Sequence, residues 1–169
     1  MQLLQKITTQ YIESEDRIRV SGELAEGQHI VLWFSQRLMV RLLPALLQWL
    51  EKQADMDVRP DLYQSLAQAA AVRALEPQAP VQAEQASQRW LVQAVDITPV
   101  DSALLLVFRS AASDPHSTAL QLQARPLRQW LNGLVEQFQK ADWPLTAWPQ
   151  WLLESRQTGQ GLQPRTILH

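Results

Sequence analysis

The chain has 169 residues and no cysteine, which excludes disulfides, thiolate zinc sites, iron–sulfur clusters and cysteine nucleophiles. Its formal net charge is −2, so no strong field attracts nucleic acid or an anionic membrane, and neither is an expected partner. Hydrophobic residues make up 46%, enough for a core, and no signal peptide or apolar segment of the roughly 20 residues that span a bilayer is evident, so we expect a soluble cytoplasmic protein.

The first third of the chain predicts three strands. Residues 3–13 and 17–21 alternate between polar and apolar side chains, which is typical of half-buried strands. Residues 29–34 form a continuous β-branched and aromatic run. Because the connections between these runs are too short for parallel crossovers, we predict an antiparallel meander.

A helix is predicted over 36–54. Its polar side chains recur every three to four positions, at Arg37, Arg41, Pro44 and Gln48, and form one narrow stripe. A helix that is apolar around most of its circumference is buried on more than one side. Pro44 should kink this helix or mark a late start, because proline has no backbone N–H to donate.

The middle of the chain is less regular. An alanine-rich stretch over 62–75 predicts a weak helix with Leu62, Leu66 and Arg73 on one face, and Pro77 ends it. The following prolines and the absence of an apolar period predict an extended linker.

A second series of strands and a helix follows. The patterns predict strands over 89–95, 102–108 and 118–124, and a helix that opens with Pro126 in its first turn. The helical pattern rests on apolar residues at the i, i+3, i+4 and i+7 spacing, namely Leu127, Trp130, Leu131, Leu134, Val135 and Phe138.

The two series resemble each other when they are displaced by about 88 positions. Arg37, Leu43, Leu46 and Lys52 align with Arg125, Leu131, Leu134 and Lys140, and Leu50 aligns with Phe138. The predicted fold class is α+β, with two repeated units that each hold a three-stranded antiparallel meander and a helix and that pack as one pseudo-symmetric domain. The units are predicted at 1–54 and 89–142, separated by the weak helix and linker at 55–88 and followed by a Trp- and Pro-rich segment with a polar tail at 143–169. The pattern leaves open whether the six strands form one sheet or two.

Three of the seven tryptophans, Trp143, Trp148 and Trp151, crowd into that last segment. They either cap the protein's own core or form a partner surface, because tryptophan is enriched in interface hot spots. We favour capping, since Pro144 and Pro149 give the segment a defined path without a partner. The polar stretch over 154–163 is expected to be weakly stabilised.

Arg37 and Arg125 are the candidate ligand-binding residues. Both lie at the junction between a strand and a helix, where the helix dipole disfavours a cation. Their partner is either an anion bound at the helix start or a structural carboxylate.

Signals for catalysis are weak. Asp114, His116 and Ser117 have the residue types of a hydrolase triad, but no Gly-x-Ser-x-Gly motif or phosphate-binding glycine loop occurs. The acidic clusters over 13–16 and 55–61 lie in predicted turns. We therefore predict no catalytic residue, no metal site and no cofactor.

The functional prediction is a non-enzymatic protein interaction or assembly module that self-associates, for example as a homodimer, or binds another protein. The alternative is a regulatory domain that binds a small ligand or anion between the two units, near Arg37 and Arg125. A hydrolase that uses His116 ranks third.

Overall fold

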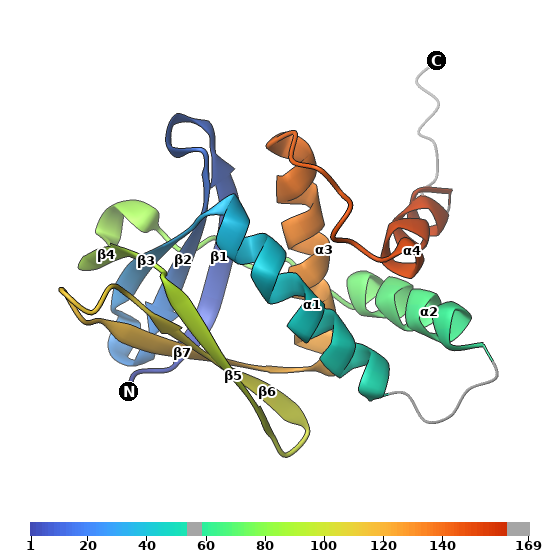
Figure 1. Ribbon diagram of the computed structural model, residues 1–169, viewed down its shortest axis with the longest axis horizontal. Helices are drawn as coiled ribbons and strands as arrows, with labels where there is room; N and C mark the ends of the chain where they lie inside the picture. The colour runs from blue at the N-terminus through green and yellow to red at the C-terminus, as the bar shows by residue number, and fades with distance from the viewer. Residues whose placement is uncertain (54–58, 162–169) are drawn as a thin grey trace.

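The computed structural model describes residues 1–53 and 59–161, and these form an α+β structure (Figure 1). The described elements are β1 (Leu4–Ile12), β2 (Arg17–Leu24), β3 (His29–Phe34), α1 (Gln36–Lys52), α2 (Pro60–Arg73), β4 (Gln88–Leu91), β5 (Ala94–Val100), β6 (Ala103–Arg109), β7 (Ser117–Gln123), α3 (Ala124–Lys140) and α4 (Gln150–Gly161). They make one sheet of four strands, one sheet of three strands and four helices.

The first sheet has the strand order β1-β2-β3-β4. Strands β1, β2 and β3 pair antiparallel, so the predicted meander is confirmed. Asp16, at the tight connection between β1 and β2, adopts a left-handed backbone with φ of 48°. Strand β4 then joins the far edge of β3 in parallel orientation.

The second sheet has the order β5-β6-β7, and all its pairs are antiparallel. The prediction of one strand over 89–95 is therefore wrong, because this stretch is divided between the two sheets. Trp90 lies on β4 and pairs with Leu32 of β3, whereas Val95 lies on β5 and pairs with Phe108 of β6. Apolar alternation reports which residues are extended, but it does not report which neighbour an edge strand will meet.

Helix α1 begins after Ser35, whose hydroxyl caps it by accepting a hydrogen bond from the Leu38 N–H at 3.2 Å. The helix continues through Pro44 without a late start. The predicted polar stripe is exposed, and the rest of the surface is largely buried. The buried side chains are Met39, Leu42, Leu43, Leu46, Leu47, Trp49 and Leu50.

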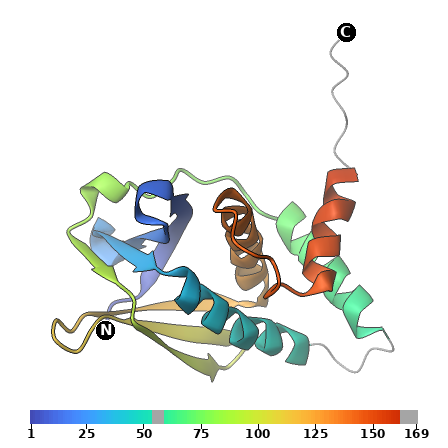
Figure 2. The ribbon, with the colours of Figure 1, turned by 45° about the horizontal axis from the view of Figure 1, so that its top comes forward.

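One hydrophobic core joins both sheets and the long helices. Helix α1 contacts β5 of the second sheet (Figure 2). Helix α3 contacts β7 of the second sheet and β1 of the first sheet. Phe34 of β3 meets Phe108 of β6 edge to face, with ring centroids 5.3 Å apart. Each sheet is therefore buried partly by a helix that follows the other sheet in the chain.

Helices α2 and α4 lie side by side at one end of the molecule, and α2 also contacts α3 (Figures 1 and 2). The polar stretch that was expected to be weakly stabilised is helical as far as Gly161. Ser155 is buried there, and Arg156 hydrogen-bonds to Asn132 of α3. Residues 162 and 163 lie outside the described residues. No described helix has the length and apolar character required to cross a membrane.

Candidate functional site

The tryptophans of the 143–151 segment are buried in the protein's own core. Trp143 packs edge to face on Tyr11 and on Phe138, with centroids 5.6 and 5.1 Å away. Trp148 packs on the same Phe138 ring at 5.3 Å. This arrangement favours core capping over a partner surface, because the indole rings are not presented to solvent.

The acidic turn between β1 and β2 has a structural role. The Tyr11 hydroxyl donates a hydrogen bond to Asp16 Oδ1 at 2.7 Å, and the Trp143 Nε1–H approaches the same oxygen at 3.3 Å. The hydrogen bond to Asp16, with partial desolvation and the nearby charges of Asp16 and Glu13, raises the pKa of Tyr11 above its usual value. In the second acidic cluster, residues 55 and 57 lie outside the described residues.

The two candidate arginines occupy equivalent places in their helices. Arg37 is the second residue of α1 and Arg125 the second residue of α3, and both side chains are exposed. Arg125 lines a groove of about 650 Å³ beside β1, but Arg37 does not line it. Neither arginine forms an ion pair within the described part of the chain. The structure therefore does not bring the two into one pocket.

His116 lies beside a carboxylate but without a nucleophile. Its Nε2 is 3.2 Å from Asp114 Oδ1, and its ring stacks on Trp90 with centroids 6.0 Å apart. Ser110 Oγ bonds only to backbone groups, including the His116 N–H. In the described ranges no serine hydroxyl hydrogen-bonds to the imidazole, and no group of three or more potential metal-binding side chains occurs.

The most unusual group in the molecule is a buried arginine, Arg128 of α3, which is only 6% exposed. Its Nη2 donates to Gln64 Oε1 at 2.6 Å, and its Nη1 lies 3.5 Å from the Gln64 carbonyl and 3.5 Å from Gln68 Oε1. Its guanidinium carbon also lies 5.7 Å from the centre of the Trp151 ring, within cation–π range. No carboxylate among the described residues forms an ion pair with it, and burial lowers the pKa of Arg128 below its usual value.

Neutral amides therefore hold this buried cation in place. Gln68 also donates to the Arg128 carbonyl at 2.8 Å, and Gln64 donates to the Leu50 carbonyl at 3.3 Å. A buried polar side chain is tolerated when its donors and acceptors are satisfied. The amides thus join α2 to α3 and to the end of α1.

In α2, this network buries the amide side chains and leaves large apolar side chains exposed. Gln64 and Gln68 are 2% and 0% exposed, whereas Leu62, Tyr63 and Leu66 are 50%, 43% and 60% exposed. An ordinary surface helix buries its leucines and exposes its amides. The helix therefore presents an exposed apolar face, defined by Leu62, Tyr63, Leu66 and Ala70, that no other described element covers.

Sequence reasoning did not identify Arg128, Gln64 or Gln68. A signal was present, because Gln64 and Gln68 are four residues apart and share a helix face, just as Leu62 and Leu66 do. Hydrophobicity favours the leucine face as the buried one. Only the position of Arg128 across the interface reverses that choice.

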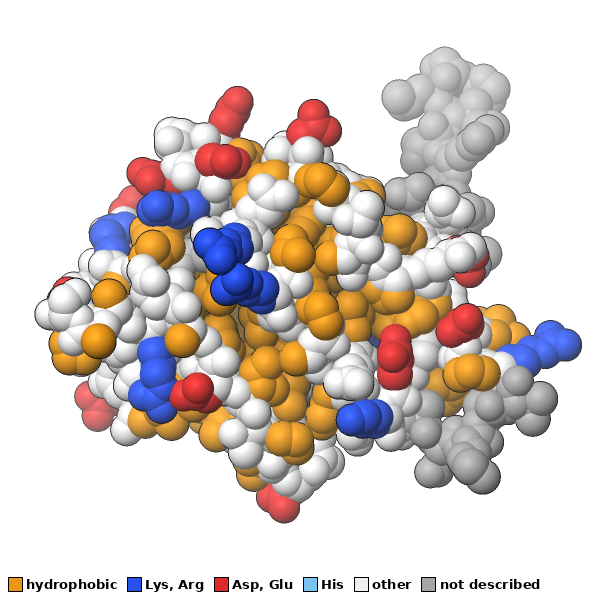
Figure 3. All heavy atoms as spheres, viewed as in Figure 1, with side chains coloured by type: hydrophobic (Ala, Val, Ile, Leu, Met, Phe, Trp, Pro, Cys, Tyr) orange, Lys and Arg blue, Asp and Glu red, His pale blue; other side chains and the backbone are white. Residues whose placement is uncertain are grey.

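Comparison with protein-family models, curated proteins and solved structures finds no match to this chain. Figure 3 shows hydrophobic side chains gathered over the middle of one face, where α1 runs, with charged groups both beside them and at the margin. Two surface features are candidate binding sites, namely the outward face of α2 and the groove beside β1.

We expect Arg128→Lys to lower the free energy of unfolding by about 1–3 kcal/mol. The compact lysine ammonium cannot reach all the oxygen atoms of Gln64 and Gln68 that the planar guanidinium reaches, so some of these buried acceptors lose their donor. Urea unfolding monitored by tryptophan fluorescence measures the change. The double variant Arg128→Met with Gln64→Leu is the control, since replacing both polar partners by apolar groups can be nearly neutral. A change within about 0.5 kcal/mol for Arg128→Lys would show that the network contributes little.

Proposed function

We propose that this protein is a non-enzymatic self-association module and that two copies pair through the outward face of α2. The observation that carries the proposal is the reversed polarity of this helix, whose amides are buried while Leu62, Tyr63 and Leu66 face solvent. A large contiguous patch of exposed apolar side chains on a protein surface marks an interaction site.

The distribution of side-chain size along α2 favours a second copy as the partner. The large residues Leu62, Tyr63 and Leu66 lie in its first half, and the small exposed residue Ala70 lies in its second half, followed by Ala74. A two-fold axis that pairs two such helices antiparallel places large side chains over small ones. One patch is then complementary to itself, as an isologous interface requires.

We also propose that the fold contains an internal duplication. Helices α1 and α3 both have 17 residues, and their buried positions correspond when shifted by the same displacement that aligns Arg37 with Arg125. The corresponding buried pairs are Met39 and Leu127, Leu42 and Trp130, Leu43 and Leu131, Leu46 and Leu134, Leu47 and Val135, Trp49 and Gln137, and Leu50 and Phe138.

The edges of the sheets support the same relation. At the start of the first unit, Leu3 forms a parallel bridge with Ala119 of β7, and at the start of the second unit, β4 pairs in parallel with β3. Each unit thus begins with a segment that pairs with the third strand of the other unit. Superposition of 4–52 on 94–140 tests the duplication, and a match confined to the two helices would contradict it.

The relation breaks at one place. Arg128 is covered by α2, whereas Val40, at the corresponding position of α1, is 39% exposed. Helix α2 therefore covers this position of α3, whereas the corresponding position of α1 stays partly exposed. Val40 gives a matched control for the association experiment.

Leu66→Glu is expected to abolish self-association without unfolding the monomer. A carboxylate in the centre of the pairing face would be desolvated, whereas a substitution at an exposed site changes stability by only about 0.5 kcal/mol. Light scattering of a dilution series measures the mass, and a thermal melt at low concentration measures the stability of the monomer.

Val40→Glu is the control, and it should leave the mass of the assembly unchanged. A wild-type protein that stays monomeric across the series would overturn the proposal. So would a Leu66→Glu variant that remains associated. Loss of association in Val40→Glu alone would move the interface to α1.

A further inference from the structure

The free edge of β1 is closed at both ends and open in the middle. At its start, the Gln2 carbonyl accepts a hydrogen bond from the Ala119 N–H of β7 at 3.0 Å. Near its end, the Tyr11 N–H donates to Gln137 Oε1 at 2.8 Å. The Gln137 amide thus takes the place that a neighbouring strand would occupy. Between these two closures, the backbone of residues 5–9 pairs with no strand at this edge and forms a window, although the Val81 N–H of the linker donates a hydrogen bond to the Thr8 side chain at 2.9 Å.

The backbone directions in this window follow from the sheet register. On β3, the carbonyls of His29 and Trp33 accept hydrogen bonds from the chain around β4, so alternate residues there face away from β2. Backbone direction alternates along each strand, and the antiparallel registers relate β3 to β2 and β2 to β1. The N–H and C=O groups of Ile7, Thr9 and Tyr11 on β1 therefore point away from β2. The Tyr11 bond to Gln137 agrees with that assignment.

Ile7 and Thr9 therefore present unpaired backbone donors and acceptors. Within the described residues, neither backbone makes a hydrogen bond across this edge. Proteins generally cover or blunt such edges, because an open edge pairs with other chains. The edge of β5 is blunted by Pro99, which has no N–H. The window in β1 contains no proline.

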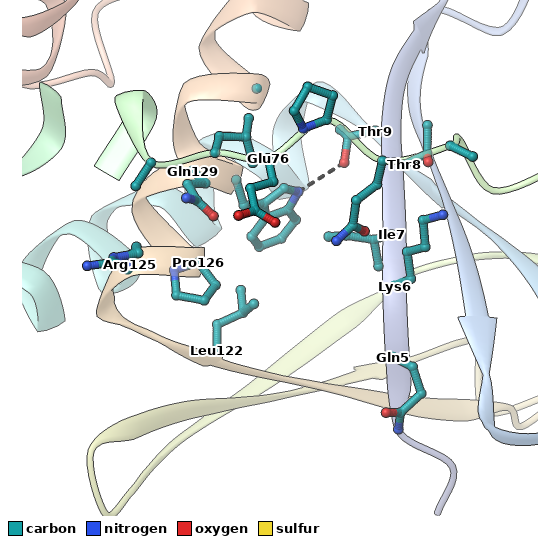
Figure 4. Close-up of a pocket in the computed structure, with 17 residues that line it drawn as sticks. Gln5, Lys6, Ile7, Thr8, Thr9, Glu76, Leu122, Arg125, Pro126 and Gln129 are labelled. Atoms are coloured by element: carbon teal, nitrogen blue, oxygen red, sulfur yellow. Dashed lines mark hydrogen bonds between the residues drawn. The ribbon is translucent and has the colours of Figure 1, made fainter. Parts of the chain in front are cut away.

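The window opens into the groove of about 650 Å³ described above (Figure 4). Leu122 and Pro126 lie across the groove from β1, and the segment 74–79 borders its other side. Trp130 also lines the groove, and its Nε1–H donates a hydrogen bond to Thr9 Oγ1 at 3.0 Å. The volume falls within the range of ordinary ligand pockets.

Gly133 is a second and independent observation. It lies inside α3 and lines the groove, and a Cβ atom built on it would meet nothing within 4 Å. Glycine inside a helix costs about 1 kcal/mol relative to alanine. No neighbouring atom requires a glycine here, and a larger side chain at this position has free space to enter the groove.

We propose that this groove binds an extended polypeptide segment of a partner by strand addition to β1. The segment pairs its backbone with the N–H and C=O groups of Ile7 and Thr9. Every second side chain faces the apolar wall formed by Leu122 and Pro126, because side chains alternate along a strand. The window of about five residues is roughly 17 Å long, which suits a single extended segment of that length.

A folded second copy fits this site less well than a peptide. The groove is bordered by α3 on one side and by the segment 74–79 on the other, and both ends of the edge are already paired. A sheet edge that belongs to a folded domain carries neighbouring strands that these walls would obstruct. One extended chain has no such neighbours.

The test uses nonapeptides selected from a random displayed library on the wild-type protein, with counter-selection on Gly133→Phe. The best selected peptide is synthesised, and its affinity is measured by fluorescence anisotropy. We expect Gly133→Phe to weaken binding by at least about tenfold, which corresponds to 1.4 kcal/mol. Methylation of alternate peptide nitrogens should weaken it similarly, because it removes the donors of a β-ladder.

Hydrogen exchange of the wild-type protein gives a readout that does not depend on a variant. The Ile7 and Thr9 amides should exchange rapidly in the free protein and slowly with the peptide bound. Gly133→Ala, which adds only a methyl group, is the control for the fold and should be at least as stable as wild type. Leu66→Glu should leave peptide binding unchanged, which separates this site from the α2 interface.

Failure to enrich any peptide over the counter-selection would overturn the proposal. A selected peptide that leaves the exchange of both amides unchanged would also overturn it. Equal binding by the wild type and Gly133→Phe would place the peptide elsewhere on the protein.

Discussion

Replacement of Trp148 by alanine is expected to lower the free energy of unfolding by about 3–5 kcal/mol. The side chain is 5% exposed and packs edge to face on Phe138 at 5.3 Å. Its Nε1 is buried and makes no hydrogen bond within the described residues. The loss is therefore one of packing, without a hydrogen bond to subtract.

Trp148→Phe is the matched control for this effect. It retains an aromatic ring beside Phe138 and removes a buried N–H that has no partner, so it should lose much less stability than Trp148→Ala. Chemical unfolding with light scattering on the same samples measures stability and association together. Near-normal stability with lost association in Trp148→Ala would contradict core capping and support a partner surface.

Replacement of Leu46 by alanine is the second large effect, with an expected loss of about 2–5 kcal/mol. Leu46 is 0% exposed in the middle of α1, within the core shared by both sheets. The cost combines the lost transfer of the side chain from water with the cavity that remains. Both sheets and α3 hold the surrounding side chains in place, so we expect limited collapse around that cavity.

Gln48→Ala, two residues along the same helix, is the control. Gln48 is exposed, and alanine has a high helix propensity, so its unfolding midpoint should change little. Urea unfolding of both variants gives the comparison. A change within about 0.5 kcal/mol for Leu46→Ala would mean that α1 is exposed at this position in solution.

Local periodicity by itself determined several of the regular elements. The alternation over 3–21 and the continuous apolar run over 29–34 predicted the β1-β2-β3 meander, and the apolar series after Pro126 predicted α3. The polar stripe of α1, which includes Arg37 and Arg41, is the exposed stripe of the structure. Side-chain direction repeats with a fixed period in helices and strands, so a long apolar pattern identifies both the element and its buried face.

Other features depended on contacts between distant parts of the chain. The stretch 89–95 contains parts of two strands, β4 and β5. Its first part joins the first sheet because β4 pairs with the free edge of β3, whereas β5 pairs with β6. Edge pairing is a backbone interaction, and backbone hydrogen bonds carry no sequence pattern of their own.

The orientation of α2 was decided in the same way. Its leucine face and its glutamine face are both regular, and hydrophobicity alone favours burying Leu62 and Leu66. Arg128 lies 64 residues from Gln64 in the chain, and its buried guanidinium requires acceptors that only the glutamine face provides. Because the free energy of leaving a buried cation unsatisfied exceeds that of exposing two leucines, tertiary structure rather than local pattern determined which side of α2 faces solvent.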